Sequence, residues 1–192
     1  QIHKKINPTN KIEMKEILVC FLSGDFDLTL DKVDIALLTI YPSNPFFNDL
    51  IELKNIISKY KSSDKDDTIA FSHFLKAELY LRKNKLGDAI KELLYITNNY
   101  KNTKIVPLVN LRLGLLHYRI KDYNNALKFI SFLENTDLSD KAIILAGQIH
   151  ELKFFDNEKA LSFYIKILDK NPKSIYFEPM RYHIRNLQNI KS

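Results

Sequence analysis

The chain has 192 residues, of which 45% are hydrophobic and 27% are charged, and its formal net charge is +6. This length and apolar content can bury a sizeable core, while the single cysteine, Cys20, excludes an intramolecular disulfide and a cysteine-based metal site. Only four glycines and six prolines are present, and the prolines fall between helical patterns, so we predict an all-α protein. No apolar run approaches the ~18 residues that cross a bilayer.

The positive charge is concentrated in the second half of the chain. Residues 1–96 contain 14 Lys or Arg and 14 Asp or Glu, and residues 97–192 contain the remaining 15 and 9. A basic end can meet an acidic partner, lipid headgroups or nucleic acid. A solubilising surface is the simpler interpretation.

The first third of the chain predicts three helices, over residues 12–22, 26–41 and 45–60. A polar lead-in over residues 1–11 precedes them, and Thr9 or Asn10 can cap the first helix. Ser43 or Asn44 can cap the third in the same way.

The rest of the chain predicts seven helices, because apolar residues recur at helical spacing between short polar connections. The predicted ranges are 67–84, 86–100, 104–120, 122–135, 139–154, 156–170 and 176–190.

A three-residue signature recurs in this part of the chain. It consists of a small residue, an aromatic residue or His three positions on, and an Ala twelve or thirteen positions on. The copies are Ala77, Tyr80 and Ala89; Gly114, His117 and Ala126; and Gly147, His150 and Ala160. The closing alanines are 126−89 = 37 and 160−126 = 34 residues apart, and a period near ~34 is typical of helix-turn-helix repeats.

Two of these copies resemble the tetratricopeptide repeat. The matching positions are Gly114-x-x-His117, Asp122-Tyr123-x-x-Ala126, Gly147-x-x-His150, Ala160 and Pro172. The segment Asp25-Phe26-x-x-Thr29 resembles a degenerate earlier copy.

The resemblance implies a right-handed superhelical solenoid of antiparallel helix pairs, with about ten helices. In this prediction the polar lead-in of residues 1–11 precedes a single helical-repeat domain over residues 12–192. The clearest repeats are expected at 67–101, 104–138 and 139–172, and a capping helix at 176–190.

Two junctions, residues 41–47 and 171–177, refine the resemblance. Each contains a proline, a Ser or Asn that can cap a helix, and an aromatic residue that opens the next helix. This arrangement is similar to bacterial tetratricopeptide proteins of the cell envelope. The resemblance implies a location in the bacterial periplasm or cell envelope, with the cytoplasm as the alternative.

A helical solenoid presents a surface, so the resemblance implies a non-enzymatic scaffold that binds a peptide or a segment of a partner protein. A structural subunit of a larger bacterial envelope or secretion assembly is the alternative, and an RNA-binding helical repeat is a weaker one. We expect the partner to be another protein or a peptide, including an acidic one. Nucleic acid is disfavoured, and any membrane contact would be peripheral.

We predict no catalytic, cofactor-binding or metal-binding residue. The chain contains no Gly-rich phosphate loop, no Gly-x-Ser-x-Gly and no His-Glu-x-x-His. His117 and His150 occupy the repeat position of Tyr80, so we expect their rings to pack between helices. The candidate partner-binding residues are polar side chains of the first helices and of the last helix: Lys76, Lys83, Asn110, Arg112, Arg119, Lys153, Arg181 and Arg185.

The last helix is expected to cover the end of the solenoid. Met180, Ile184 and Leu187 fall on one stripe that should pack on the helix predicted over 156–170. Arg181 and the other polar residues would then form the outer face.

Overall fold

The computed structural model describes residues 8–189. Within this range it contains ten α-helices and no strand, so the predicted all-α class and helix number are confirmed. The helices are α1 (Pro8–Ser23), α2 (Phe26–Thr39), α3 (Phe47–Tyr60), α4 (Lys65–Arg82), α5 (Leu86–Asn99), α6 (Val106–Arg119), α7 (Tyr123–Ser131), α8 (Ser139–Leu152), α9 (Asn157–Lys170) and α10 (Phe177–Asn189).

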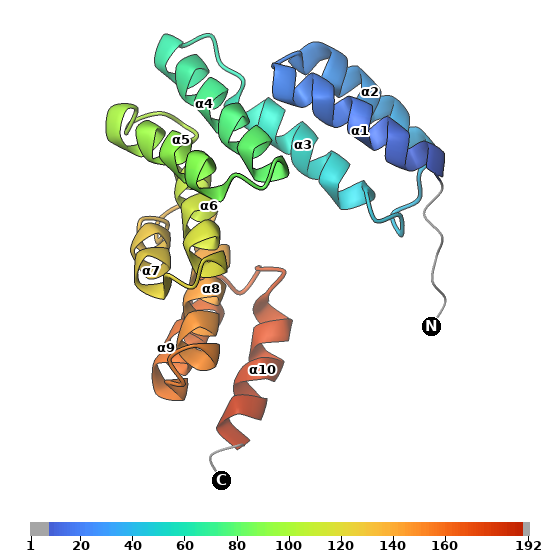
Figure 1. Ribbon diagram of the computed structural model, residues 1–192. Coiled ribbons are helices and arrows are strands. Elements are labelled where there is room, and N and C mark those ends of the chain that lie inside the picture. Colours follow the sequence, from blue (N-terminus) through green and yellow to red (C-terminus); the bar gives the residue numbers. More distant parts are fainter. Residues whose placement is uncertain (1–7, 190–192) are drawn as a thin grey trace. The chain divides into compact units, whose positions relative to one another are not determined.

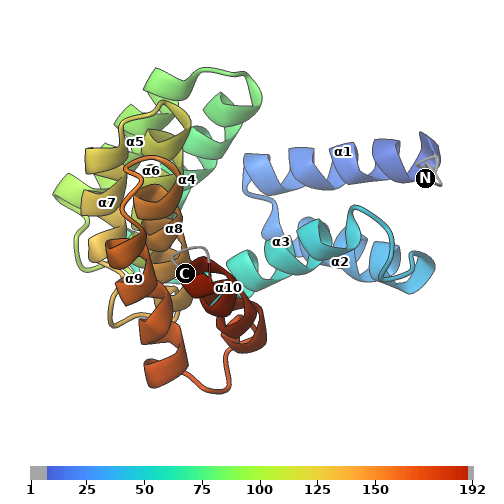
Figure 2. The ribbon, with the colours of Figure 1, turned by 90° about the horizontal axis from the view of Figure 1, so that it is seen from below.

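The helices form two compact units, which divide between Ile105 and Val106. The first unit contains α1 to α5 and the second contains α6 to α10 (Figure 1). In the first unit α1 packs on α2 and α4 packs on α5, and in the second α6 packs on α7 and α8 on α9. The last helix, α10, packs beside α9 (Figure 2).

The four helix pairs share one turn conformation. Each turn contains a residue with positive φ: Gly24 at 83°, Asn84 at 56°, Lys121 at 65° and Phe155 at 56°. Glycine and asparagine adopt this left-handed conformation readily, whereas Lys and Phe do so rarely. The residue five positions after each of them is fully buried in its pair: Thr29, Ala89, Ala126 and Ala160 are all 0% exposed. The repeated signature therefore marks repeated backbone geometry.

Three of the four turns also cap the second helix with an aspartate. The carboxylates of Asp25, Asp122 and Asp156 each accept a hydrogen bond from the backbone N–H three residues on, at 3.3, 3.3 and 2.9 Å. An N-cap of this kind satisfies a helical N–H that has no partner within the helix. In the α4–α5 turn Lys85 takes this position and provides no such bond.

Several helix starts differ from the predicted ones, and two of these differences have a local cause. The first helix begins at Pro8 instead of near Ile12, because proline is tolerated in a first turn, where its missing N–H needs no partner. Residues 1–7 of the predicted lead-in lie outside the described residues. The third helix begins at Phe47, because the Asn44 side chain accepts the N–H of Phe46 at 2.9 Å and forms a turn before the helix.

Among the helix ends, that of α7 differs most from the prediction. The helix predicted over 122–135 ends at Ser131, because Leu133 reaches the core through a tight turn, in which its N–H bonds to the carbonyl of Ile130 at 3.1 Å. The Thr136 hydroxyl then donates to the Leu133 carbonyl at 3.0 Å and accepts the Leu138 N–H at 3.2 Å. Such side-chain bonds to the backbone compete with a continued helix.

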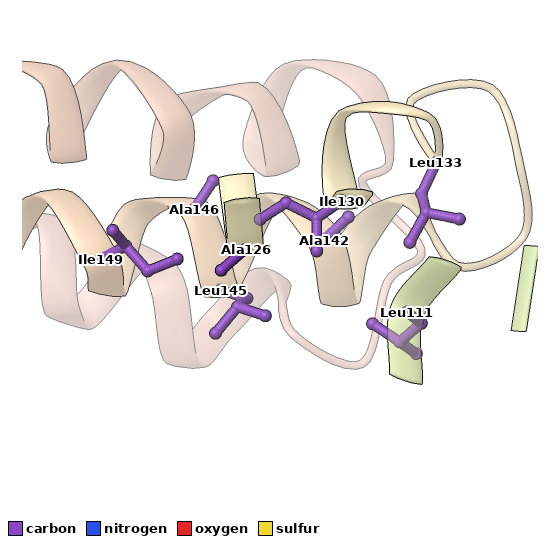
Figure 3. Packing of buried hydrophobic residues seen from close by; sticks show 8 residues of the cluster. All are labelled: Leu111, Ala126, Ile130, Leu133, Ala142, Leu145, Ala146 and Ile149. Carbon is purple, nitrogen blue, oxygen red and sulfur yellow. The ribbon is translucent and has the colours of Figure 1, made fainter. Parts of the chain in front are cut away.

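The core of the second unit joins α6, α7 and α8 (Figure 3). Its buried members are Leu111, Ala126, Ile130, Leu133, Ala142, Leu145, Ala146 and Ile149. The alanines allow close approach of the helices, and the larger side chains fill the grooves between them.

A smaller core joins α9 to α10. Ile184 and Leu187 pack with Ala160 and Tyr164, and Met180 lies against the same cluster. The predicted packing of the last helix on α9 is therefore confirmed, and Arg181 is exposed.

The core of the first unit is aromatic. The rings of Phe26 and Phe71 stack with their centroids 4.9 Å apart, and Phe21, Tyr60 and Phe74 surround Phe71 at 6.2–6.5 Å. These contacts bind the α1–α2 pair to α3 and α4.

Candidate functional site

The predicted partner-binding residues are distributed over both units. Two belong to the first unit and six to the second. The positions are Lys76 on α4 and Lys83 just after it, Asn110, Arg112 and Arg119 on α6, Lys153 just after α8, and Arg181 and Arg185 on α10.

Their exposure differs. Lys76, Lys83, Arg119, Arg181 and Arg185 are exposed, and Arg112 and Lys153 are half-buried. Asn110 is only 7% exposed, so it has little surface for a partner. The Lys153 ammonium lies 5.6 Å from the centre of the Tyr118 ring, and Arg181 forms an ion pair with Glu178 at 3.5 Å.

A groove in the first unit includes one predicted residue. This groove has a volume of about 390 Å³ and lies beside the end of α1, the start of α2 and one face of α4. Phe26, Phe71 and Leu75 form its apolar lining, and Lys61 and Lys76 contribute ammonium groups. Lys61 is paired with Asp27 at 2.6 Å.

A second groove, the α7–α9 groove, lies wholly within the second unit. It has a volume of about 380 Å³ and runs along α8 between α7 and α9. Its apolar lining comes from all three helices: Leu127, Ile130, Ala142, Ile143, Ala146 and Phe163. Ser131, the last residue of α7, and Glu134, three residues after it, also line the groove.

The rim of the α7–α9 groove is basic. Lys159 and Lys166 line it from α9, and Lys170 of the same helix forms an ion pair with Glu134 of the lining at 3.1 Å. The hydrogen bond and charge of Lys170, with the charge of Lys166, hold the pKa of Glu134 below its usual value. The Lys166 ammonium also lies 4.9 Å from the centre of the Phe163 ring. The groove lining and Lys170 together therefore hold three lysines and one carboxylate, which is already paired with Lys170.

His150 also lines the α7–α9 groove. His150 is only 4% exposed. Its ring stacks on the Phe163 ring, with the centroids 5.4 Å apart and an interplanar angle of 11°. Phe154 meets the ring edge-on at 5.3 Å. Its Nδ1 is buried and has no hydrogen-bond partner among the described residues. Burial lowers the pKa of His150, nearby Lys159 lowers it further, and Asp156 opposes this.

The packing expected of the two histidine rings is confirmed. His117 stacks on Phe129 at 5.2 Å, as His150 does on Phe163, and its Nδ1 lies 3.0 Å from the Asp122 carboxylate. In both pairs the ring of the first helix packs on an aromatic residue of the second.

The pKa of His150 predicts a pH dependence of stability. Burial places its folded-state pKa below the unfolded value of 6.5, so between the two values the unfolded chain binds more protons. The stability contributed by the neutral ring is present above pH 6.5 and is lost as the pH falls through the folded-state pKa. We expect the free energy of unfolding to fall between pH 8 and pH 5, and to fall less in His150→Phe, which keeps an aromatic ring. Urea unfolding at both pH values measures this, and equal losses in parent and variant would contradict the assignment.

A polar network ties the last helix to the α8–α9 pair. The Tyr164 hydroxyl donates to the Glu151 carboxylate at 2.8 Å, and His183 Nε2 lies 2.9 Å from the same oxygen. Burial and the bond to Glu151 raise the pKa of Tyr164, which keeps the hydroxyl protonated. Asp140 of α8 accepts from the Ser174 hydroxyl and from the Asn171 amide in the loop before α10. These bonds fix the position of α10.

The lysines of the α7–α9 groove are not among the residues predicted to bind a partner. They lie on the second helix of a pair, whereas the predicted residues came mainly from first helices. A signal was available, because Lys159, Phe163 and Lys166 recur at i, i+4 and i+7 and therefore share one face of α9.

Within residues 8–189 no group of three His, Cys, Asp or Glu side chains is arranged to hold a metal ion. None of the helices described there is both long and apolar enough to cross a membrane. In comparisons with known proteins, no family model matches the chain and no curated protein matches it.

Proposed function

We propose that the protein is a non-enzymatic scaffold that binds a segment of a partner protein. In this proposal its helix pairs are tetratricopeptide-like repeats that stack in a right-handed solenoid. The common turn conformation and the common buried small residue of the four pairs support repeats of one kind.

One observation carries the binding role: each unit has an open groove of about 380–390 Å³ with an apolar lining and lysine side chains. Such a groove can bury one or a few apolar side chains of a partner while its polar groups fix their orientation. The envelope location is part of the proposal, on the resemblance of residues 41–47 and 171–177 to bacterial envelope proteins.

A structural subunit of a larger assembly is the second candidate, and the outer face of α10 favours it. Arg181 and Arg185 are exposed there, with Tyr182 70% exposed beside them. An assembly partner would then meet α10 and not a groove. The double variant Arg181→Glu, Arg185→Glu separates the two candidates, because exposed charges contribute little to folding.

Selection from a displayed library of random 12-residue peptides tests the scaffold function. We expect the chain to enrich a family of related peptides that bind it in solution. Their affinity should be unchanged by Arg181→Glu with Arg185→Glu. Loss of binding in that variant would favour the structural subunit, and a selection that enriches no peptide would contradict the scaffold function.

A further inference from the structure

We infer that the α7–α9 groove binds an extended, acidic segment of a partner protein, in which an apolar residue lies between two carboxylates. This inference rests on the proposed scaffold function and names the partner's chemistry and its site. Both the shape and the charge of the groove lead to it.

The lining of the groove favours an apolar side chain of the partner. Ala142 and Ala146 of α8 present only methyl groups to the groove, and Ile130 and Phe163 stand on either side. A volume of about 380 Å³ is enough for a Leu, Ile, Met or Phe side chain with part of its backbone. Burying such a side chain is favourable, which anchors the segment without specifying its neighbours.

The lysines of the rim favour acidic residues on both sides of that apolar residue. Lys159 and Lys166 are seven residues apart on one face of α9, which at 1.5 Å per residue is about 10.5 Å along the helix. In a polyproline II segment, which is extended and has three residues per turn, residues three apart point to the same side and are separated by about 9 Å. Two carboxylates at that spacing can therefore meet the two ammonium groups while an apolar residue between them enters the groove beside Phe163.

The charge already in the groove selects the same partner. Its one carboxylate, Glu134, is paired with Lys170, so the charge that remains is positive. A basic segment would be repelled by Lys159 and Lys166. An acidic segment is attracted by both lysines, and its binding should weaken as salt is added.

His150 provides an independent sign of a polar ligand. It is a nearly buried polar side chain in the groove lining, and its Nδ1 has no hydrogen-bond partner in the described part of the chain. Buried polar groups without partners are rare in folded proteins. A ligand that enters the groove beside Phe163 comes next to this ring.

The test uses the peptides enriched by the whole 192-residue chain, labelled with fluorescein, with affinity measured by fluorescence anisotropy. We expect their sequences to share two Asp or Glu three positions apart with Leu, Ile, Met or Phe between them. Charge reversal by Lys159→Glu with Lys166→Glu should weaken binding about tenfold or more. Ser131→Trp, which fills the groove from an exposed position, should also weaken it.

The matched control is Lys128→Glu with Lys141→Glu, which makes the same charge change at exposed positions of α7 and α8 outside the groove lining. This variant should keep parental affinity, and circular dichroism checks that every variant is folded. Enriched peptides that are basic, or whose binding is insensitive to both groove variants, would overturn the inference and leave the scaffold function standing. A chain that enriches no peptide would overturn both.

Discussion

Gly147→Ala is expected to destabilise the protein by about 1–3 kcal/mol, although alanine is the better helix former. A Cβ at this position of α8 would overlap the Tyr164 ring, with Cδ1 and Cζ each 2.7 Å away. The ring cannot easily move aside, because Tyr164 is 1% exposed and its hydroxyl is bonded to Glu151 at 2.8 Å. Overpacking therefore outweighs the helix-propensity gain of roughly 1 kcal/mol.

Gly87→Ala is the matched control. Gly87 lies in the first turn of α5, and a Cβ there would meet no atom within 4 Å, so the same substitution should stabilise by up to about 1 kcal/mol. Urea unfolding of both variants measures the difference in sign. In a Tyr164→Ala background Gly147→Ala should no longer destabilise. A Gly147→Ala protein as stable as the parent would show that α8 and α9 are not in close contact at this crossing.

Ala126→Leu is expected to cost a similar amount, about 1–3 kcal/mol. Ala126 is 0% exposed in the core shown in Figure 3. Its carbonyl lies 3.5 Å from the position of a Cβ at Gly114, so the α6 and α7 backbones approach closely there. A leucine would push the two helices apart.

Asn124→Leu adds a leucine at an exposed site of the same helix, and its effect should stay within about 0.5 kcal/mol of the parent. Thermal unfolding compares the two variants. If Ala126→Leu unfolded at the same temperature as the parent, the alanine would not mark a close crossing, and the repeat register would be wrong.

The helix pairs could be predicted because the residues that set their geometry are unusual in type. Gly114 and Gly147 lie in helix interiors, where glycine is disfavoured unless backbones approach. Each lies at a crossing in the structure, against Ile130 and Tyr164 respectively. The stripe that packs α10 on α9 was predictable for a related reason, because its apolar residues recur at helical spacing.

The turns and one helix end could not be predicted in the same way. Lys121 and Phe155 have no intrinsic preference for positive φ, so only the packing of the two helices that each joins imposes it. The early end of α7 depends on the burial of Leu133, whose spacing from Ile130 fits a continued helix equally well.

The α7–α9 groove depends on where α7 ends, so it could not be predicted from the sequence either. Ser131 and Glu134 line the groove where α7 stops and α9 continues. The spacing of the lysines on α9 can be recognised in the sequence. It indicates a binding site only together with the apolar groove beside it. Among the predicted residues, Lys76 lines a groove, the one in the first unit.

A titration followed by nuclear magnetic resonance shows which part of the chain binds the peptide. An enriched peptide is added to the isotope-labelled chain, and the shift of each backbone amide is recorded. We expect the largest shifts on residues that line the α7–α9 groove, such as Ser131, Ala146 and Phe163, and much smaller shifts at the same peptide concentration in Lys159→Glu with Lys166→Glu. Shifts confined to α10 or to the groove beside Phe71 would contradict binding in the α7–α9 groove.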